Sequence, residues 1–467
     1  MKKDMKILLV TPISDTHYVV PPIGLGYLAS SLRKNGFPEV SILDCIKENM
    51  DYEKFREYIK SEVPDIVGFQ IFSCDFSNTL KQIRIVKEEN PSACILVGGA
   101  HVSTTRERIL DDAPDVDFGF WGEAETTLPK LIRKFAGDDS IKYDDIEGLI
   151  RKENGRTIVN ERVFIEELDR LEFPAWDLID PRTYPENPQG AFFEKFPIAP
   201  ISTSRGCPYL CTFCASHTNM GRRVRLRSIE NVIKEMELLY NEYSVREFHI
   251  IDDVFNLYKD RVLAFCDALK EKRWDISYTF PNGIRLNTLD LEVLTAMKET
   301  GAYSFTVGIE SGSQRILDHM KKSLSLKEIE EKINLINEAG LTPSGFFIVG
   351  YPAETEEDIF KTIEFAKKLK IKRAHFSNFL PLPGTEATKR LLESKEIEEI
   401  NWSQLFYSKV PYSPPGISRK RLKALQRKAF ISFHLRPSII IKMLSEIKSF
   451  RHLKSLLKRM TDYLFKT

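Results

Sequence analysis

A strand followed by a helix recurs six times between Ile198 and about Leu392. Strands that alternate with helices pair into a parallel sheet, because each helix carries the chain back before the next strand starts. Six units are too few to close the barrel that eight units form, so we expect an open (βα)6 partial barrel whose active site faces the carboxyl ends of its strands. The predicted strands are Ile201–Thr203, Glu247–Ile251, Ser277–Phe280, Ser304–Ile309, Ser344–Val349 and His375–Phe379.

The first 137 residues repeat this alternation in shorter units. Short apolar runs are separated by helical patterns that close at Gly, Asn or Pro. This α/β pattern predicts a doubly wound, Rossmann-like sheet, which binds ligands beyond the carboxyl ends of its strands. The predicted strands are Lys6–Val10, Val40–Leu43, Ile66–Gln70, Cys94–Val97 and Phe118–Trp121, and the helices include Leu25–Lys34 and Asn78–Glu89. The loops at the binding edge are Thr11–Pro22, Ile71–Ser77, Gly98–Thr105 and Gly122–Thr126.

The remaining sequence falls into two further regions. Residues 138–197 are rich in Pro and contain a hairpin-like segment at 148–159, so we expect an ordered linker between the first domain and the barrel of residues 198–395. Residues 396–467 are expected to form a basic helical C-terminal region.

Three cysteines lie close together at the start of the barrel region, in the pattern Cys207-x3-Cys211-x2-Cys214. Three thiolates on one loop can hold a soft metal centre. With His217 as a fourth ligand they would form a structural zinc site. Alternatively they would hold a four-iron cluster in which one iron is open to a substrate or cofactor. The other four cysteines lie far apart among apolar residues, which is not typical of a disulfide framework. They are Cys45, Cys74, Cys94 and Cys266.

The triad, with Phe213 directly before its last cysteine, resembles the radical S-adenosylmethionine (SAM) superfamily. The resemblance implies that the three thiolates bind a [4Fe–4S] cluster, that the open iron chelates SAM, and that cleavage of SAM yields a 5′-deoxyadenosyl radical. Motifs after the later strands follow the order found in that family. The residues implied to contact SAM are Phe213, Asp252, Asp253, Arg285, Glu310, Ser311, Gly350, Glu354 and Pro383. The Asp252-Asp253 pair departs from the Gly-Gly-Glu of many members, as occurs in the cobalamin-dependent branch.

The N-terminal region resembles the cobalamin-binding domain that is fused to some radical enzymes. The resemblance rests on residues 21–27 (Pro-Pro-Ile-Gly-Leu-Gly-Tyr), residues 97–101 (Val-Gly-Gly-Ala-His) and Gly122-Glu123. The paired glycines follow a predicted strand and would let a planar ligand approach the backbone, although Gly-Gly alone is also typical of a tight turn. The residues implied to contact cobalamin are His17, Ser73, Gly98, Gly99, His101, Gly122 and Glu123.

His17 is the candidate cobalt ligand. Cobalamin domains that ligate cobalt carry Asp-x-His-x-x-Gly after the first strand, and this chain has Asp15-Thr-His17-Tyr-Val-Val20. Val20 replaces the Gly, and many radical relatives lack a lower His ligand. The alternative is a solvated loop residue.

Charge is distributed unevenly along the chain. Residues 418–467 contain 14 Lys or Arg against two acidic residues, a net charge of +12, whereas the whole chain has +1. This asymmetry points to an anionic partner. Apolar residues recur there as one predicted helical stripe, which either caps the barrel or lies on an anionic membrane. They are Ile440, Leu444, Ile447, Leu453, Leu457, Met460 and Leu464. Few aromatic residues accompany the basic ones, so nucleic acid is not expected as a partner.

The sequence contains no apolar run of about 18 residues and no cleavable leader pattern, so we expect a cytoplasmic protein. The basic tail suggests that the protein also makes peripheral contact with the inner face of the membrane.

These features predict an enzyme that joins cobalamin to radical chemistry. The resemblance implies methylation of an unactivated carbon in a small-molecule or lipid-like substrate, with electrons from a donor such as ferredoxin or flavodoxin. A radical SAM cyclase or other tailoring enzyme is the alternative, and a non-catalytic cobalamin or redox sensor is a further one. A tRNA-methylthiolating enzyme fits less well, because that family carries cluster cysteines in its N-terminal domain. The sequence names neither the substrate nor a catalytic residue.

Overall fold

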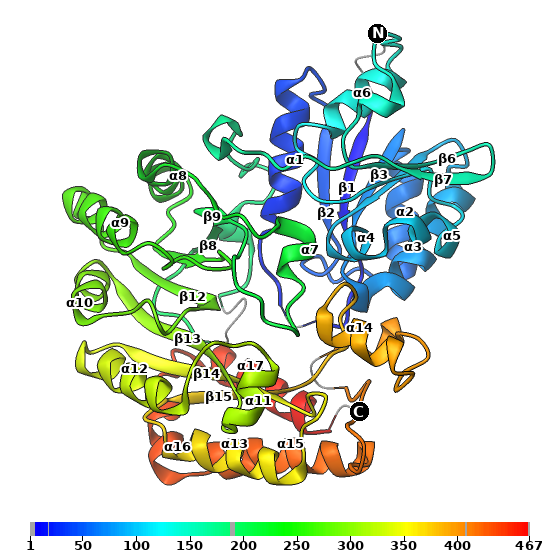
Figure 1. The fold of residues 1–467 in the computed structure, drawn as a ribbon. Coiled ribbons are helices and arrows are strands. Elements are labelled where there is room, and N and C mark those ends of the chain that lie inside the picture. Colours follow the sequence, from blue (N-terminus) through cyan, green and yellow to red (C-terminus); the bar gives the residue numbers. More distant parts are fainter. Residues whose placement is uncertain (1–4, 17, 187–191, 407–408, 466–467) are drawn as a thin grey trace. The chain divides into compact units, whose positions relative to one another are not determined.

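The structure is a computed structural model that describes residues 5–16, 18–186, 192–406 and 409–465 (Figure 1). The chain forms two compact units. The first consists of Met1–Tyr184 and Ala215–Arg227, and the second of Pro185–Cys214 and Ser228–Thr467. The first unit is therefore built from two separate stretches of sequence. The domain borders expected at residues 137, 197 and 395 stay predictions.

The first unit contains a seven-stranded sheet in the order β2-β1-β3-β4-β5-β6-β7. Strands β1 to β5 run parallel, which confirms the predicted doubly wound fold. The order turns back between β1 and β3, and sheets of this kind bind ligands beside that point. The strands are β1 Ile7–Thr11, β2 Val40–Asp44, β3 Ile66–Gln70, β4 Cys94–Gly98, β5 Phe118–Phe120, β6 Leu149–Glu153 and β7 Arg156–Val159. The unit also contains α1 Ile23–Lys34, α2 Tyr52–Glu62, α3 Phe76–Glu89, α4 Ala100–Thr105, α5 Ile109–Asp112, α6 Leu128–Phe135, α7 Ser216–Met220 and the short strand β10 Arg225–Leu226.

Helices cover both faces of this sheet (Figure 1). On one face, Leu9 of β1 packs in a buried cluster with Leu25 of α1 and Leu131 of α6. On the other face, the Phe55 ring of α2 lies 6.4 Å from the Phe69 ring of β3. Each fully buried side chain of this size contributes roughly 1.5–3 kcal/mol, so the helices fix the strand ends that form the binding edge.

The hairpin of β6 and β7 belongs to this sheet. The sequence places it in a linker, but β6 pairs antiparallel with β5, and β7 pairs with β6. Strand β5 has only three residues and would otherwise be an unprotected edge, a position that proteins commonly cover. The sheet therefore extends beyond the parallel strands that alternation with helices can predict.

The second unit contains six parallel strands in sequence order, from β8 at one edge to β15 at the other. This confirms the open (βα)6 sheet. The strands are β8 Ile198–Ile201, β11 Glu247–Ile250, β12 Ser277–Ile284, β13 Ala302–Glu310, β14 Thr342–Val349 and β15 Arg373–Asn378, with a short β9 at Ser204–Arg205. The helices are α8 Ile229–Glu242, α9 Lys259–Lys272, α10 Leu291–Glu299, α11 Gln314–His319, α12 Leu326–Glu338, α13 Glu356–Lys368 and α14 Glu386–Glu393.

The first strand of this sheet starts three residues earlier than predicted. Strand β8 includes Pro200, which lacks a backbone donor and weakens the strand pattern in the sequence. Proline is tolerated here because β8 pairs on one side only, with β11.

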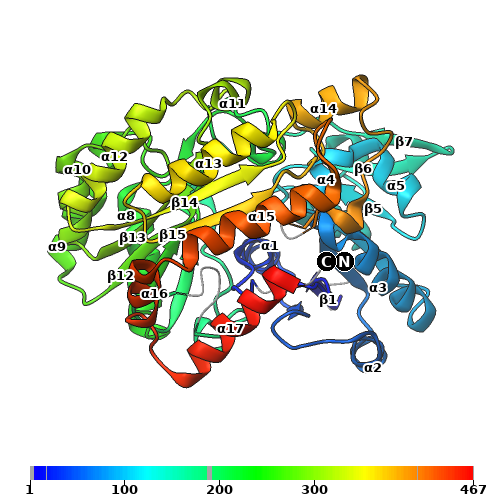
Figure 2. The same cartoon turned by 90° about the horizontal axis from the view of Figure 1, so that it is seen from below.

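Three helices form the tail of the second unit: α15 Arg419–His434, α16 Pro437–Leu444 and α17 Phe450–Phe465. Helix α15 lies along β15 (Figure 2), where Phe433 contacts Phe376 and Gln426 hydrogen-bonds Asn378 at 2.9 Å. The predicted single stripe is wrong, because residues 445–449 separate α16 from α17.

The break between α16 and α17 is held by specific contacts. Glu446 forms ion pairs with Lys372 at 2.5 Å and with Arg373 at 3.0 Å, at the start of β15. His452 is buried between Phe192 and Phe193. The tail therefore covers part of the edge that the amino ends of the strands form. Within the described ranges, every helix is too short or too polar to cross a bilayer.

Candidate functional site

The three clustered cysteines lie on an irregular loop after β9. Each is half-buried, and none of the three is in a disulfide. The loop is fixed at Thr212, whose N–H donates to the Met320 carbonyl at 3.0 Å and whose carbonyl accepts from the Ala387 N–H at 2.9 Å. The Thr212 hydroxyl also hydrogen-bonds the Tyr351 hydroxyl at 2.8 Å. These partners follow β13, β15 and β14 respectively, so the loop lies at the carboxyl edge of the sheet.

Charges from neighbouring strand ends act on Cys207. Burial raises the pKa of the Cys207 thiol, and the nearby charges of Asp253 and Cys211 raise it further, while Arg285 lowers it. A protonated thiol must lose its proton to bind metal, so metal binding here is coupled to pH. Three thiols on one loop are the soft donor set that an iron–sulfur cluster takes. Among the described residues, no three His, Cys, Asp or Glu side chains are grouped to hold a single metal ion.

Three of the residues predicted to contact SAM come together beside this loop. Glu310 ends β13, and its carboxylate accepts a hydrogen bond from Lys322 at 2.7 Å. The Lys322 ammonium also lies 5.8 Å from the centre of the Phe213 ring. Arg285, which follows β12, donates to the Lys322 carbonyl and stacks 3.9 Å above the Tyr209 ring. Phe213, Arg285 and Glu310 thus surround one lysine, which no sequence motif had indicated.

The two neighbouring aspartates differ in their surroundings. Asp252 is 3% exposed and accepts hydrogen bonds of 2.6 Å from the Thr203 N–H, the Thr203 hydroxyl and the Ser204 hydroxyl. Burial raises the pKa of Asp252 although these bonds lower it. Asp252 therefore braces the start of the cysteine-bearing segment. Asp253 is exposed, and its charge reaches Cys207.

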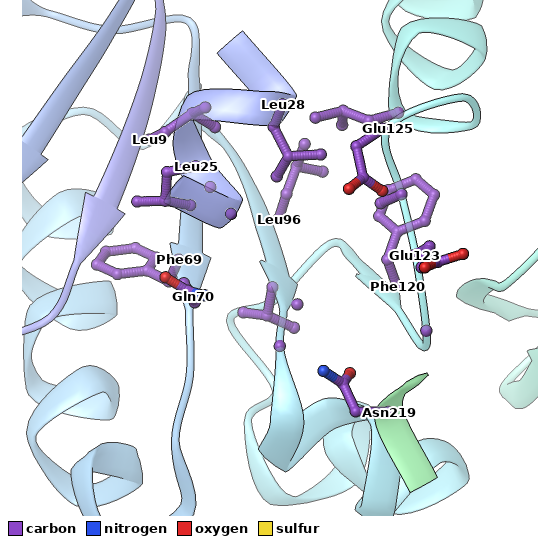
Figure 3. Close-up of a pocket in the computed structure, with 18 of the residues that line it drawn as sticks. Leu9, Leu25, Leu28, Phe69, Gln70, Leu96, Phe120, Glu123, Glu125 and Asn219 are labelled. Atoms are coloured by element: carbon purple, nitrogen blue, oxygen red, sulfur yellow. The ribbon is translucent and has the colours of Figure 1, made fainter. Parts of the chain in front are cut away.

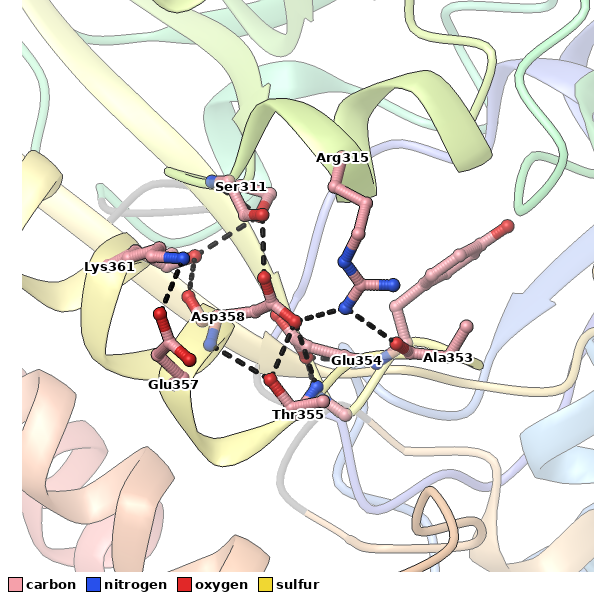
Figure 4. Close-up of polar contacts among 12 residues, drawn as sticks. Ser311, Arg315, Ala353, Glu354, Thr355, Glu357, Asp358 and Lys361 are labelled. Carbon is pink, nitrogen blue, oxygen red and sulfur yellow. Dashed lines mark hydrogen bonds and ion pairs between the residues drawn. The ribbon is translucent and has the colours of Figure 1, made fainter.

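A second polar cluster lies after β13 and β14 (Figure 4). Ser311 contacts the Thr362 hydroxyl at 3.1 Å, and Glu354 accepts from the N–H groups of Gly350 at 2.5 Å and Tyr351 at 3.2 Å. Burial raises the pKa of Glu354 to about 8, although the two N–H groups lower it. These contacts shape the loop that carries Gly350.

Asp358 is the centre of this cluster and was not predicted. It accepts from Ser313 at 2.7 Å and from the Thr355 hydroxyl at 2.8 Å, and it pairs with Arg315 (Figure 4). Burial raises the pKa of Asp358, but these hydrogen bonds outweigh it and bring the pKa to about 2. The Thr-x-x-Asp pattern at 355–358 is a capping box, and this pattern in the sequence would have indicated Asp358. Pro383 is buried in the loop between β15 and α14.

The first unit has a cavity of about 140 Å³ at the carboxyl edge of its sheet (Figure 3). Leu9, Leu25 and Leu96 line one end, and Asn219 of α7 lies at the other. The wall also includes Gly24, Gly68, Gly98, Gly99, Gly122, Glu123 and Met220. The cavity is therefore mostly apolar, with backbone exposed at its glycines.

Four of the residues predicted to contact cobalamin line this cavity: Gly98, Gly99, Gly122 and Glu123. Gly99 has φ +96°, and a Cβ there would lie 3.0 Å from the Ile71 carbonyl oxygen, so a side chain would disturb the wall. The glycines leave room for a flat, largely apolar group.

Ser73 and His101 hydrogen-bond each other at 3.0 Å beside the Phe76 ring. Burial, with the charge of Arg108, lowers the pKa of His101 to about 4, so the imidazole is neutral at pH 7. Neither residue is among those that line the cavity. The predicted cobalt ligand His17 lies outside the described residues.

Comparison with known protein families gives two matches. Residues 201–366 match the radical SAM superfamily, and residues 11–132 match the B12 binding domain. The matched ranges contain the cysteine loop and most of the glycine-lined cavity, respectively.

Relatives match along nearly the whole chain. An uncharacterized methyltransferase of Pyrococcus horikoshii is 34% identical, covering 96% of each chain. The cytidylyl-2-hydroxyethylphosphonate methyltransferase of Streptomyces wedmorensis is 28% identical, covering 89% of this chain and 87% of its own. The anaerobic magnesium-protoporphyrin IX monomethyl ester cyclase of Cereibacter sphaeroides is 27% identical over 86% of this chain and 64% of its own.

Two solved structures share the fold. The cobalamin-dependent SAM radical enzyme OxsB, with aqua-cobalamin and SAM bound, has a TM-score of 0.75 at 16% identity, covering 99% of this chain and 71% of its own. The methyltransferase TsrM from Kitasatospora setae, with cobalamin and a [4Fe–4S] cluster bound, has a TM-score of 0.70 at 18% identity, covering 90% and 84%. This chain therefore belongs to the radical SAM superfamily, among the enzymes that carry an N-terminal B12-binding domain and use a [4Fe–4S] cluster, SAM and cobalamin.

Proposed function

We propose that this enzyme methylates an unactivated carbon of a small-molecule substrate. The observation that carries the proposal is the presence on one chain of a three-thiol loop at the carboxyl edge of a (βα)6 sheet and a glycine-lined cavity at the carboxyl edge of a doubly wound sheet. The methyltransferase relatives support methyl transfer as the outcome.

In the second unit, Cys207, Cys211 and Cys214 would hold the cluster. When bound, the cluster supplies the electron that cleaves SAM, and a donor such as ferredoxin or flavodoxin would restore it. The cations Arg285 and Lys322 suit the carboxylate of SAM, and Glu310 suits its ribose hydroxyls. Phe213 offers an apolar face for the adenine. Asp252, Ser311 and Glu354 hold the surrounding loops through the hydrogen bonds described above.

In the first unit, the cavity would hold a planar part of cobalamin. Its mostly apolar wall suits an uncharged ring, and Gly98, Gly99 and Gly122 would let the ligand approach the backbone. Neutral His101 and Ser73 hold the loop after β3 against α4. When bound, cobalamin supplies the methyl group that the substrate receives. Ser73, His101 and Glu123 are proposed to act by shaping this edge.

The stoichiometry of SAM tests methyl transfer. Anaerobic turnover should consume two SAM per product, one giving 5′-deoxyadenosine and the other giving S-adenosylhomocysteine by way of cobalamin. Both products can be counted by mass spectrometry alongside a substrate that gains 14 mass units, about one CH₂. Deoxyadenosine without S-adenosylhomocysteine, and a product without an added methyl, would overturn the proposal.

A radical cyclase is the second candidate, because a cyclase relative aligns with 86% of this chain. A cyclase reaction would convert SAM to 5′-deoxyadenosine only, whereas methyl transfer would also form S-adenosylhomocysteine. The same product count therefore separates the two reactions.

We propose further that the tail touches an anionic membrane surface, which would bring a lipid-like substrate within reach. Large apolar side chains are exposed along α16 and α17 in a region of net charge +12. They are Ile440, Ile441, Leu444, Phe450, Leu457 and Met460. Each basic residue near an anionic surface contributes about 1 kcal/mol, and apolar burial adds to it.

Vesicle sedimentation tests the membrane contact. The protein should sediment with anionic but not neutral vesicles, high salt should release it, and the double variant Leu457→Gln, Met460→Gln should stay in the supernatant. Equal recovery in the supernatant with both vesicle types would refute the proposed membrane contact. It would also leave no reason to consider a lipid-like substrate.

A further inference from the structure

Residues 215–227, which we call the strap, follow Cys214 directly and yet belong to the first unit. The chain thus leaves the cysteine loop and enters the unit that contains the glycine-lined cavity. Asn219 and Met220 of the strap form part of the cavity wall, and Figure 3 shows Asn219 there. The distance along the sequence from Cys214 to this wall is five residues.

A buried ion pair fixes the strap at its far end. The guanidinium of Arg225 donates to the Glu123 carboxylate at 2.5 Å, and the two side chains are 2% and 3% exposed. The same guanidinium donates to the carbonyls of Met220 at 3.0 Å and Ile165 at 2.9 Å. Arg225 therefore connects the cavity-lining Glu123 to the backbone of the cavity-lining Met220.

A second set of contacts fixes the middle of the strap. The Ser103 hydroxyl donates to the Asn219 side chain at 3.0 Å and accepts from the Gly122 N–H at 3.0 Å. Arg162 donates to the Thr218 carbonyl and lies 4.4 Å above the Trp121 ring. These bonds join the strap to α4 and to the loop after β5, both of which are part of the edge that the cavity occupies.

The backbone of the strap also closes tightly. Gly221 has φ +78°, and a Cβ there would lie 2.8 Å from the Phe164 ring, which the Arg225 guanidinium covers at 4.7 Å. Because packed and hydrogen-bonded segments move as units, a ligand that orders the cavity wall also orders the strap.

We infer that the strap is a positioning element that couples the cobalamin cavity to the cysteine loop: a ligand against Asn219 and Met220 orders the strap, and the strap orders the loop that ends at Cys214. The inference rests on the proposed function in that the ligand is cobalamin and the loop carries the cluster. It assigns to Arg225, Glu123 and Asn219 a role in coupling in addition to holding the fold.

Coupling is reciprocal, so it can be measured from both sides. In the wild-type protein, reconstitution of the cluster should tighten hydroxocobalamin binding by about fivefold or more, and saturating hydroxocobalamin should slow iron release to a chelator by a similar factor. Hydrogen exchange in residues 208–227 should fall when hydroxocobalamin is added, which gives a readout independent of turnover.

Variants distinguish coupling through the strap from coupling by another route. Arg225→Lys keeps a charge for Glu123 but loses the forked bonds to the two carbonyls. In Arg225→Lys and in Asn219→Ala, the cluster should no longer change hydroxocobalamin affinity, even at concentrations where both cofactors bind. Arg223→Ala is the matched control, because Arg223 is 78% exposed and its ion pair with Glu166 lies at the surface. It should keep the wild-type coupling.

The outcomes separate this inference from the proposed function. Wild-type protein that binds hydroxocobalamin with the same affinity with and without its cluster would overturn the coupling and leave the proposed function intact. Coupling that persists in both strap variants would place it outside the strap and also overturn the inference. Failure of wild-type protein to bind hydroxocobalamin at all would overturn the proposed function itself.

Discussion

Lys322 and Glu310 form an ion pair of 2.7 Å at the carboxyl end of β13, with side chains only 10% and 8% exposed. Glu310 has φ +68°, a backbone conformation that is uncommon for a residue with a side chain. Strain of this kind costs of order 1–3 kcal/mol and persists only where surrounding contacts hold it. The ion pair is one such contact.

Removing the cation should therefore destabilise the second unit. Lys322→Met leaves a buried carboxylate without its partner, which typically costs about 3–5 kcal/mol. Lys322→Met combined with Glu310→Gln should recover part of this loss, because no buried charge remains unpaired. Urea unfolding measures both. Lys327→Met is the control, since Lys327 is exposed and its pair with Glu331 is 3.7 Å apart. A stability of Lys322→Met equal to that of Lys327→Met would contradict the prediction.

Substitution of a cluster cysteine should reduce bound iron, whereas substitution of another cysteine should not. Cys211→Ala should abolish SAM cleavage and reduce bound iron well below the approximately four irons expected of the anaerobically reconstituted wild type. Cys94→Ala should leave iron content unchanged, because Cys94 begins β4 in the first unit whereas the triad belongs to the second. Iron analysis and the visible absorption spectrum measure the difference. Stoichiometric zinc in the wild type, without visible absorption, would contradict the assignment of the triad as cluster ligands.

Gly99→Ala should weaken hydroxocobalamin binding by about tenfold or more, equivalent to 1.4 kcal/mol, because its Cβ would press on the Ile71 backbone at the cavity wall. Gly36→Ala is the matched control: Gly36 has a similar φ of +88°, and a Cβ there would meet nothing within 4 Å. Its affinity for hydroxocobalamin should equal that of the wild type. Titration followed by absorption gives both values, and equal weakening in the two variants would show that backbone strain alone is responsible.

Glu354 should make stability depend on pH. Burial raises its pKa to about 8 in the folded protein, from an ordinary value of 4.5 that also applies to the unfolded chain. Between pH 4.5 and pH 8 the folded state therefore binds more protons than the unfolded state. The free energy of unfolding therefore falls as pH rises through this window. Glu354→Gln removes this dependence, and its stability relative to wild type should improve by on the order of 1–3 kcal/mol from pH 5 to pH 8. Thermal unfolding at several pH values measures the trend; a constant difference would refute it.

The sequence predicts the parallel strands well because their apolar runs are continuous and their order follows the chain. β3 begins and ends as predicted, and β14 begins two residues before the predicted Ser344. The hairpin of β6 and β7 is recognisable locally, but its pairing with β5 depends on an unprotected edge that no local pattern contains. The break at residues 445–449 escapes prediction because Glu446 finds its partners on β15, far away in the sequence.

The candidate site was predictable where its residues are adjacent in sequence. Cys207, Cys211 and Cys214 stand within one short loop, and Gly98-Gly99 directly follows a strand. Lys322 was not predictable, because it follows α11 and reaches back to β13 without any motif of its own. The same applies to Arg225, whose partner Glu123 lies 102 residues earlier.

The divided sequence of the first unit has a consequence for the order in which the protein is made. Domains fold as they emerge during synthesis, starting from the N-terminus. When residues 1–184 have been synthesised, Glu123 has no Arg225, and a buried carboxylate without its cation is strongly disfavoured. The cavity wall also still lacks Asn219 and Met220. The first unit can therefore reach its final form only after residue 227 has left the ribosome, by which time all three cysteines of the triad have already been synthesised.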